Sequence, residues 1–207
     1  MPMQSPPATL VVAYHGGRGH TAALAAAVVT GAETVPDVEV REVRVDEMTV
    51  AQWRNLDEST AIVFGAPTYM GTASAAFHTF AEASSRRQFV RRWQDKLAAG
   101  FTNSGAKAGD KSGTLGYFAT LAAQHGMTWI NLGLPAGWNK SSGSEFDVNR
   151  LGFFAGAAAQ SNVDEGPAAV HQADLATAQH LGRRVGEHAR VVVAGRQALA
   201  VREELTR

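Results

Sequence analysis

The chain has 207 residues, of which 45% are hydrophobic and 18% are charged, a balance typical of a folded protein. Its 19 Lys and Arg residues equal its 19 Asp and Glu residues, which argues against a strongly basic nucleic-acid-binding protein. The absence of cysteine excludes disulfides, cysteine-ligated zinc, iron–sulfur clusters and thiol catalysis. Residues 1–8 do not resemble a signal peptide, and no apolar run approaches the length of about 18 residues that spans a bilayer, so we expect a cytoplasmic protein.

Five short runs predict strands. Most are apolar throughout, which is typical of buried strands in a parallel sheet. The run at Val38–Val45 instead alternates with period two, which suits a strand with one face partly exposed. The strands are predicted at residues 9–14, 38–45, 60–64, 97–102 and 127–132.

Helical patterns alternate with these strands, and the alternation predicts an α/β protein with a doubly wound parallel sheet. Gly182 and Gly186 interrupt the last helical pattern. We expect residues 1–207 to form a single domain with a core at about 8–193 and a tail at 194–207. The helices are predicted at residues 21–32, 49–55, 73–84, 112–125 and 168–193.

The segment Gly133–Pro167 is rich in Gly, Ser and Asn and is predicted to be a long loop. Loops of this length are usually functional or locally disordered. Trp138 within it fits two interpretations equally well, a cover over a planar ligand and a member of a small hydrophobic cluster.

Ligands of parallel sheets bind beyond the carboxyl ends of the strands. The first loop at that edge is His15–Thr21 (HGGRGHT), between a strand and a helix. Backbone N–H groups and the dipole of a helix N-terminus favour an anion, so the loop fits a phosphate site as well as a tight turn. The dinucleotide pattern G-x-G-x-x-A also matches it, but weakly, because Glu39 and Asp46 lie poorly for the required acidic residue.

Two further loops follow predicted strands. Gly65–Thr72 (GAPTYMGT) offers flat and adaptable apolar surface, and Thr102–Lys107 (TNSGAK) offers small polar donors and one cation. The stretch Gly105–Ser112 (GAKAGDKS) is not a P-loop, because it has too few residues between its glycines and Asp110 precedes the lysine.

Other patterns carry less weight. The spacing of His171, His180 and His188 fits no zinc motif, and no metal site is predicted. The basic run Arg86–Arg92 is interpreted as a solvated helix end. His125, at a helix–strand junction, fits a cap or surface residue as well as a ligand-binding one.

Four motifs in this order and spacing, GRGHT, GAPTYMGTAS, TNSGAKAGDK and LAAQHGM, resemble the WrbA-type NAD(P)H:quinone oxidoreductases, which are FMN proteins of the flavodoxin-like fold. The similarity runs from about Leu10 to about Leu134 and more loosely to Arg190. The resemblance implies a five-stranded parallel sheet with strand order 2-1-3-4-5.

The resemblance also implies where FMN would lie: its phosphate at the first loop, its ring at the second, and its ribityl chain and ring edge at the third. His125 would lie near the pyrimidine side of the flavin, contributed within an oligomer, and His125 and Tyr69 are the expected catalytic residues. The sequence has Gly16 where the family usually has Ser, and Tyr69 and Met70 where it usually has Arg and Phe. The implied FMN-binding residues are Gly16, Gly17, Arg18, Gly19, His20, Thr21, Pro67, Thr68, Tyr69, Met70, Gly71, Thr72, Asn103, Ser104, Gly105 and His125.

The implied function is an FMN-dependent oxidoreductase that transfers two electrons from NADH or NADPH to a quinone by a ping-pong mechanism. The implied assembly is a homodimer or homotetramer, with no nucleic-acid or membrane partner. In such an enzyme the flavin carries the chemistry and the protein binds and orients it. Two alternatives stay open. One is a flavodoxin-like electron-transfer protein, against which the neutral charge counts. The other is a flavin-free binding or regulatory protein of the same fold.

Overall fold

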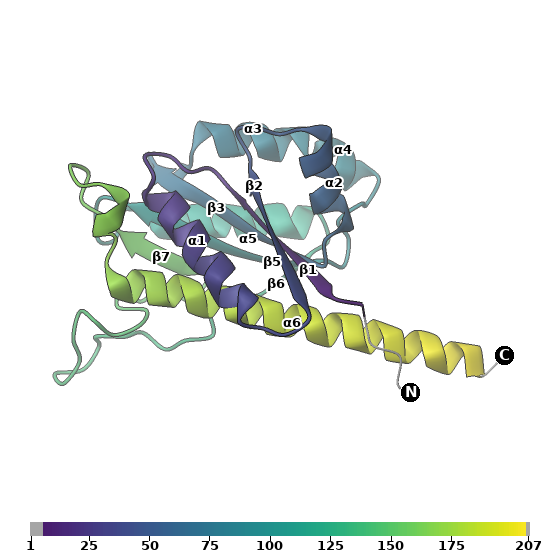
Figure 1. Cartoon of the computed structure of the whole chain (residues 1–207). Helices are drawn as coiled ribbons and strands as arrows, with labels where there is room; N and C mark the ends of the chain where they lie inside the picture. Colours follow the sequence, from purple (N-terminus) through teal and green to yellow (C-terminus); the bar gives the residue numbers. More distant parts are fainter. Residues whose placement is uncertain (1–5, 206–207) are drawn as a thin grey trace.

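The centre of the computed structural model, which describes residues 6–205, is a seven-stranded sheet (Figure 1). The main path runs β2-β1-β3-β5-β6, and all of its pairings are parallel. Two more strands lie off this path, β4 antiparallel to the end of β3 and β7 parallel to β5. The strands are β1 (Ala8–Tyr14), β2 (Val38–Arg44), β3 (Ala61–Tyr69), β4 (Thr72–Ala73), β5 (Leu97–Ser104), β6 (Thr128–Trp129) and β7 (Ala157–Gln160).

The flavodoxin-like α/β fold is therefore confirmed, with one correction. The five predicted strands lie in the predicted order, which reads 2-1-3-5-6 in the numbering of the structure because the two-residue β4 takes a number. The predicted total of five strands is wrong, because β4 and β7 are too short to leave a periodic signal in the sequence.

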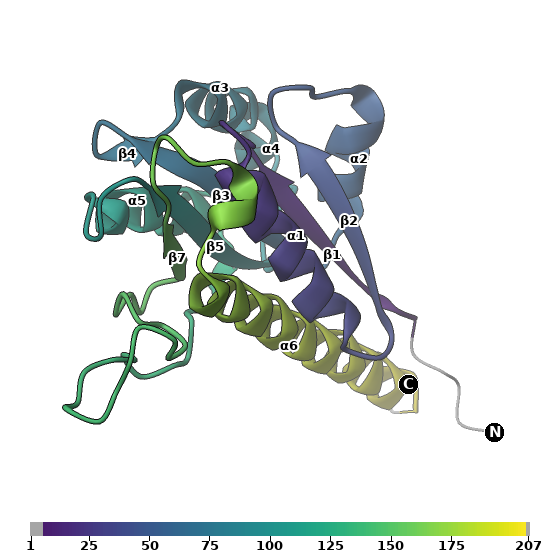
Figure 2. The same cartoon turned by 60° about the vertical axis from the view of Figure 1, so that its left-hand side comes forward.

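Apolar side chains point to both faces of the sheet, and helices cover both (Figures 1 and 2). Leu10 and Val12 of β1 pack toward α1 and α6, and Val11 packs on the opposite face. That second face is covered by α2, α3 and α5, with aromatic rings at its centre. The helices are α1 (His20–Glu33), α2 (Val50–Glu58), α3 (Ala75–Ala83), α4 (Ser85–Phe89), α5 (Lys111–Gln124) and α6 (Gln172–Leu205), with a short 3₁₀ turn at Pro167–Ala169.

Helices α1 and α6 pack unusually closely. A Cβ atom on Gly31 would overlap the Gln179 carbonyl, and one on Gly182 would overlap the Val28 carbonyl. The single helix predicted at residues 168–193 is confirmed as α6, which runs without a break to Leu205, and Gly182, which interrupts its helical pattern, permits this approach. The predicted tail is helical as far as the structure describes it, and α6 extends well past the sheet (Figure 1).

The edge of the sheet beyond β5 is shared by two short strands. Strand β6 pairs with Leu97 and Ala98, and β7 pairs with Phe101 to Ser104. Residues 130–156 connect them, and part of this connection extends away from the sheet in both views (Figures 1 and 2). The predicted strand at 127–132 is thus too long, and the predicted long loop contains β7. Within residues 6–205, no helix combines the length and apolar character needed to cross a bilayer.

Candidate functional site

A hollow of about 460 Å³ opens at the carboxyl ends of β1, β3 and β5. Its volume lies in the range of about 300–1,000 Å³ that is common for small-molecule sites. Nine of the predicted binding residues line it, together with Ser161 and Val163, which were not predicted. The nine are Arg18, His20, Thr21, Pro67, Thr68, Tyr69, Asn103, Ser104 and Gly105.

The first loop turns sharply between β1 and α1. Gly17 and Gly19 have φ angles of 55° and 104°, in the region that favours glycine. Within the described residues, the backbone N–H groups of Gly17, Arg18 and Thr21 donate no hydrogen bond. Free N–H groups at the start of a 14-residue helix form a fitting site for a phosphate.

The second predicted loop is mostly strand. Strand β3 continues to Tyr69, and a two-residue turn leads into β4. Both turn residues, Met70 and Gly71, have positive φ angles of 51° and 83°, as in the tight hairpin turns that suit sheet twist. Met70 is 101% exposed, and the Thr72 hydroxyl contacts the His78 ring at 3.3 Å. Met70, Gly71 and Thr72 therefore form a rim beside the hollow, while Pro67, Thr68 and Tyr69 line it.

Thr68 lines the hollow, but its hydroxyl proton is not available to a ligand. The Thr102 hydroxyl donates to the Ala66 carbonyl at 2.7 Å, so it accepts from Thr68 at 2.8 Å. Thr114 then donates to Thr68 at 2.7 Å. This buried chain uses the Thr68 proton and fixes β3 against β5 and α5.

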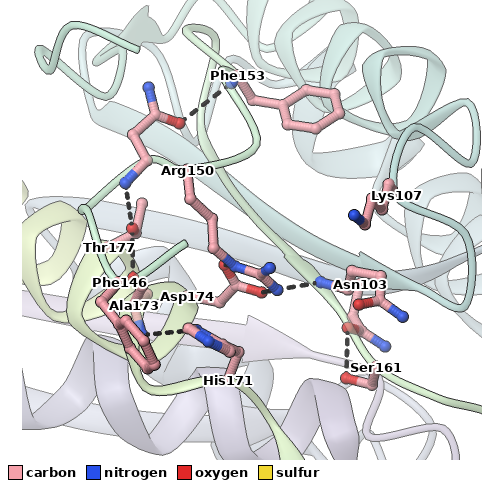
Figure 3. Close-up of polar contacts among 12 residues, drawn as sticks. Asn103, Lys107, Phe146, Arg150, Phe153, Ser161, His171, Ala173, Asp174 and Thr177 are labelled. Carbon is pink, nitrogen blue, oxygen red and sulfur yellow. Dashed lines mark hydrogen bonds and ion pairs between the residues drawn. The ribbon is translucent and has the colours of Figure 1, made fainter. Parts of the chain in front are cut away.

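The third loop begins inside β5, which ends at Ser104. The Ser161 hydroxyl donates to the Asn103 side-chain oxygen at 2.9 Å, and both residues are buried (Figure 3). This bond leaves the Asn103 amide N–H₂ as a donor for a ligand. Gln160 donates to the Gly105 carbonyl at 2.9 Å, which also ties β7 to this loop.

The connection from β7 to α6, residues 161–171, forms the wall that the sequence did not reveal. The His20 ring contacts the Glu165 carbonyl at 2.9 Å, and a Cβ atom on Gly19 would lie 3.2 Å from Pro167. Val163 borders Gly105 on the other side. The wall thus joins the first and third loops. Its only sequence signal was its place in the long Gly-, Ser- and Asn-rich segment.

A buried ion pair holds this wall in place. Arg150 binds Asp174 through two hydrogen bonds of 2.8 and 2.9 Å, with side chains 5% and 1% exposed (Figure 3). The Asp174 carboxylate also accepts from the Gln160 backbone at 3.0 Å. The pair therefore connects the 130–156 segment, α6 and β7 at one point.

The hollow has a positive electrostatic character. Of the described residues that line it, Arg18 is charged and none is a carboxylate. Lys111 lies fully buried behind the third loop, and burial lowers the pKa of its ammonium to about 8, so it is charged at neutral pH. Such surroundings suit an anionic ligand.

His125 does not lie at this hollow. Helix α5 starts at the carboxyl edge of the sheet, so its end and His125 lie at the amino edge. The His125 ring is 4% exposed, contacts the Ser84 hydroxyl at 2.9 Å and packs 4.4 Å from the Trp93 ring centre. Burial, and repulsion from Arg87, lower its pKa to about 4. Its predicted role at the flavin of a neighbouring subunit stays a prediction.

The structure changes the interpretation of Arg87 and leaves both interpretations of Trp138 open. Arg87 of the basic run is not simply solvated, because it forms an ion pair with Asp57 at 2.9 Å and lies 3.9 Å from the Trp53 ring centre. Trp138 is 47% exposed, with the Lys107 ammonium 5.7 Å from its ring centre. Among the described residues, no group of three or more His, Asp or Glu side chains could hold a metal ion.

Comparisons with known proteins agree with this architecture. The chain is 44% identical over 176 residues to "Flavodoxin FldP" of Pseudomonas aeruginosa, covering 84% of this chain and 93% of the relative. It is 31% identical over 202 residues to "NAD(P)H dehydrogenase (quinone)" of Archaeoglobus fulgidus, covering 87% and 96%. The solved structure of a "flavodoxin, WrbA-like protein" from Agrobacterium tumefaciens superposes with a TM-score of 0.71 at 37% identity, covering 88% of this chain and 98% of that one. Residues 9–136 match the NADPH-dependent FMN reductase family, and the chain belongs to this family as a WrbA-type, flavodoxin-like protein.

Proposed function

We propose that the protein binds FMN in the 460 Å³ hollow and acts as an oxidoreductase that transfers two electrons from NADH or NADPH to a quinone. The observation that carries the proposal is the set of first-loop N–H groups that donate no hydrogen bond within residues 6–205, at a helix N-terminus that opens into a hollow lined by none of the described carboxylates. The family and the quinone-dehydrogenase relative support the same chemistry.

Residues on different sides of the hollow bind different parts of the cofactor. The N–H groups of Gly17, Arg18 and Thr21 bind the terminal phosphate, assisted by the Arg18 cation. The Asn103 amide, oriented by Ser161, donates to the polar edge of the cofactor. When bound, FMN supplies the electron-transfer chemistry, and no side-chain nucleophile is required.

Tyr69, which lines the hollow, and Met70 of the rim border the side on which substrates bind. Their side chains, 47% and 101% exposed, offer an aromatic face and a flexible apolar contact to a nicotinamide or a quinone. Because both substrates use this side in turn, the kinetics are ping-pong. We further propose a homodimer or homotetramer, which sedimentation velocity of the purified chain tests.

Visible absorption of the purified protein is the first test. Oxidised flavin absorbs in the blue, and a preparation reconstituted with FMN should retain this absorption through desalting. Steady-state turnover with NADH or NADPH and benzoquinone is the second test. Retention of FMN with parallel-line kinetics supports the proposal, and failure to retain FMN after reconstitution overturns it.

A second candidate is an electron-transfer flavodoxin, which the relative named "Flavodoxin FldP" favours at 44% identity. The same experiment separates the two. An electron carrier retains FMN but is not reduced directly by NADH or NADPH, whereas the proposed enzyme is reduced by one of them without any partner protein.

A further inference from the structure

Lys111 lies in the stretch Gly105–Ser112, which is not a P-loop, and the site described above does not explain its position. It is the first residue of α5, it is fully buried, and its ammonium turns back onto the loop that precedes the helix. Four oxygen atoms of that loop accept hydrogen bonds from it. They are the Ser104 hydroxyl and the carbonyl oxygens of Ala106, Lys107 and Ala108, at 2.7, 2.6, 3.0 and 3.3 Å.

This arrangement controls which way the loop's peptide groups face. Because a peptide unit is planar and trans, a carbonyl turned toward the ammonium turns the next N–H away from it. Within the described residues, the backbone N–H groups of residues 105–110 donate no hydrogen bond. The loop therefore holds its carbonyls inward and its N–H groups outward, next to Ser104 and Gly105, which line the hollow.

No other cation of the loop could replace this one. The neighbouring Lys107 ammonium has the Trp138 ring as its contact, at 5.7 Å, and holds none of these oxygen atoms. Arg150 is bound to Asp174 through two hydrogen bonds and holds none of these oxygen atoms. The Phe153 ring, 5.8 Å from the Lys111 ammonium, closes the pocket around it.

We propose that Lys111 is a positioning residue: its ammonium binds the loop 104–108 from within and fixes the edge of the hollow that Asn103, Ser104 and Gly105 present to the cofactor. The effect on FMN rests on the function proposed above. The effect on the loop does not, and it can be measured in the flavin-free protein.

The test compares Lys111→Met with Lys107→Met, which removes the same charge from the same loop without touching its oxygen atoms. In flavin-free protein, trypsin should cut after Lys107 about tenfold faster in Lys111→Met than in the parent, the ratio expected when charge-assisted hydrogen bonds of this kind are lost. The identity of the cut is verified with Lys107→Met, in which it must disappear.

With FMN added, Lys111→Met should raise the Kd about tenfold and change the visible circular dichroism of the bound flavin, whereas Lys107→Met should leave the Kd within about twofold. If Lys111→Met does not fold, Lys111→Gln, which keeps an amide donor, should show intermediate values of both quantities. A folded Lys111→Met or Lys111→Gln that is cut at the parental rate overturns the proposal. If the parent binds no FMN, the proposed function fails while the trypsin result still decides the role of Lys111.

Discussion

A Cβ atom on Gly17 would lie 3.1 Å from the Tyr69 hydroxyl oxygen and 3.2 Å from Pro67, so a methyl group there would fit only if these neighbours moved by a few tenths of an ångström. The same glycine has a φ of 55°. Both constraints act on the loop that carries the free N–H groups. They also place this loop, the proposed phosphate site, directly beside Tyr69 on the substrate side of the hollow.

Replacing Gly17 by Ala should therefore weaken FMN binding. The left-handed backbone costs about 1–2 kcal/mol for a residue with a Cβ, and relief of that strain displaces the N–H groups. We expect the Kd for FMN, measured by fluorescence titration, to rise at least about tenfold.

Gly16→Ala is the matched control for that change. A Cβ on Gly16 would meet its nearest neighbours at 3.7 and 3.9 Å, which is ordinary contact, and its φ is not positive. FMN affinity should stay within about twofold of the parent. Equal losses in both variants would show that the loop tolerates no added side chain for reasons other than the Gly17 geometry.

Tyr69→Arg should favour the phosphorylated substrate. A guanidinium beside the first loop offers a cation to the phosphates of NADPH, where Tyr69 offers a neutral hydroxyl. The KM for NADPH should fall by about fivefold, corresponding to about 1 kcal/mol, with little change for a neutral quinone. Tyr69→Phe, which keeps the ring, should leave both KM values unchanged. Shifts of equal size for both substrates in Tyr69→Arg would place the side chain outside the substrate region.

The sequence was sufficient for the elements that carry strong periodic or compositional signals. The five runs that lie in the sheet were found, and so were three loops at its carboxyl edge, because β-branched strands followed by Gly-rich turns are distinctive. Strand β7 (AAAQ) was missed, because alanine favours helix and four residues carry no period. Its neighbour Ser161 was missed for the same reason, although it orients Asn103.

Long-range packing accounts for the other differences. In the sequence Gly182 appears only as an interruption of the last helical pattern, since its contact with Val28 on α1 cannot be deduced from either segment alone. The role of His125 at the flavin of a neighbouring subunit, which the resemblance implies, stays a prediction. In the folded chain the 14-residue α5 separates His125 from the carboxyl edge and buries it beside Trp93.

The burial of His125 predicts acid sensitivity. Its pKa is lowered to about 4 in the folded protein, while the unfolded chain binds the proton near pH 6.5. Because the unfolded state then holds more protons, the free energy of unfolding should fall by about 2–3 kcal/mol as pH drops from about 6.5 to about 4. Urea unfolding across this range measures the loss. The decline should be shallower in His125→Asn, and parallel curves would refute the assignment to His125.

Breaking the buried Arg150–Asp174 ion pair should lower the free energy of unfolding strongly. Its side chains are almost wholly buried, so Arg150→Met leaves the Asp174 carboxylate without its cation and should destabilise the fold by about 3–5 kcal/mol. The exposed pair Arg183–Glu187, 3.4 Å apart, is the control, and Arg183→Met should cost less than about 1 kcal/mol.

Because Asp174 also holds the Gln160 backbone, Arg150→Met should weaken FMN binding beyond its effect on unfolding, through the wall at Ser161. Chemical unfolding and FMN titration of the two variants separate these effects. Unchanged FMN affinity in a destabilised Arg150→Met would mean that the ion pair supports the fold without positioning the wall.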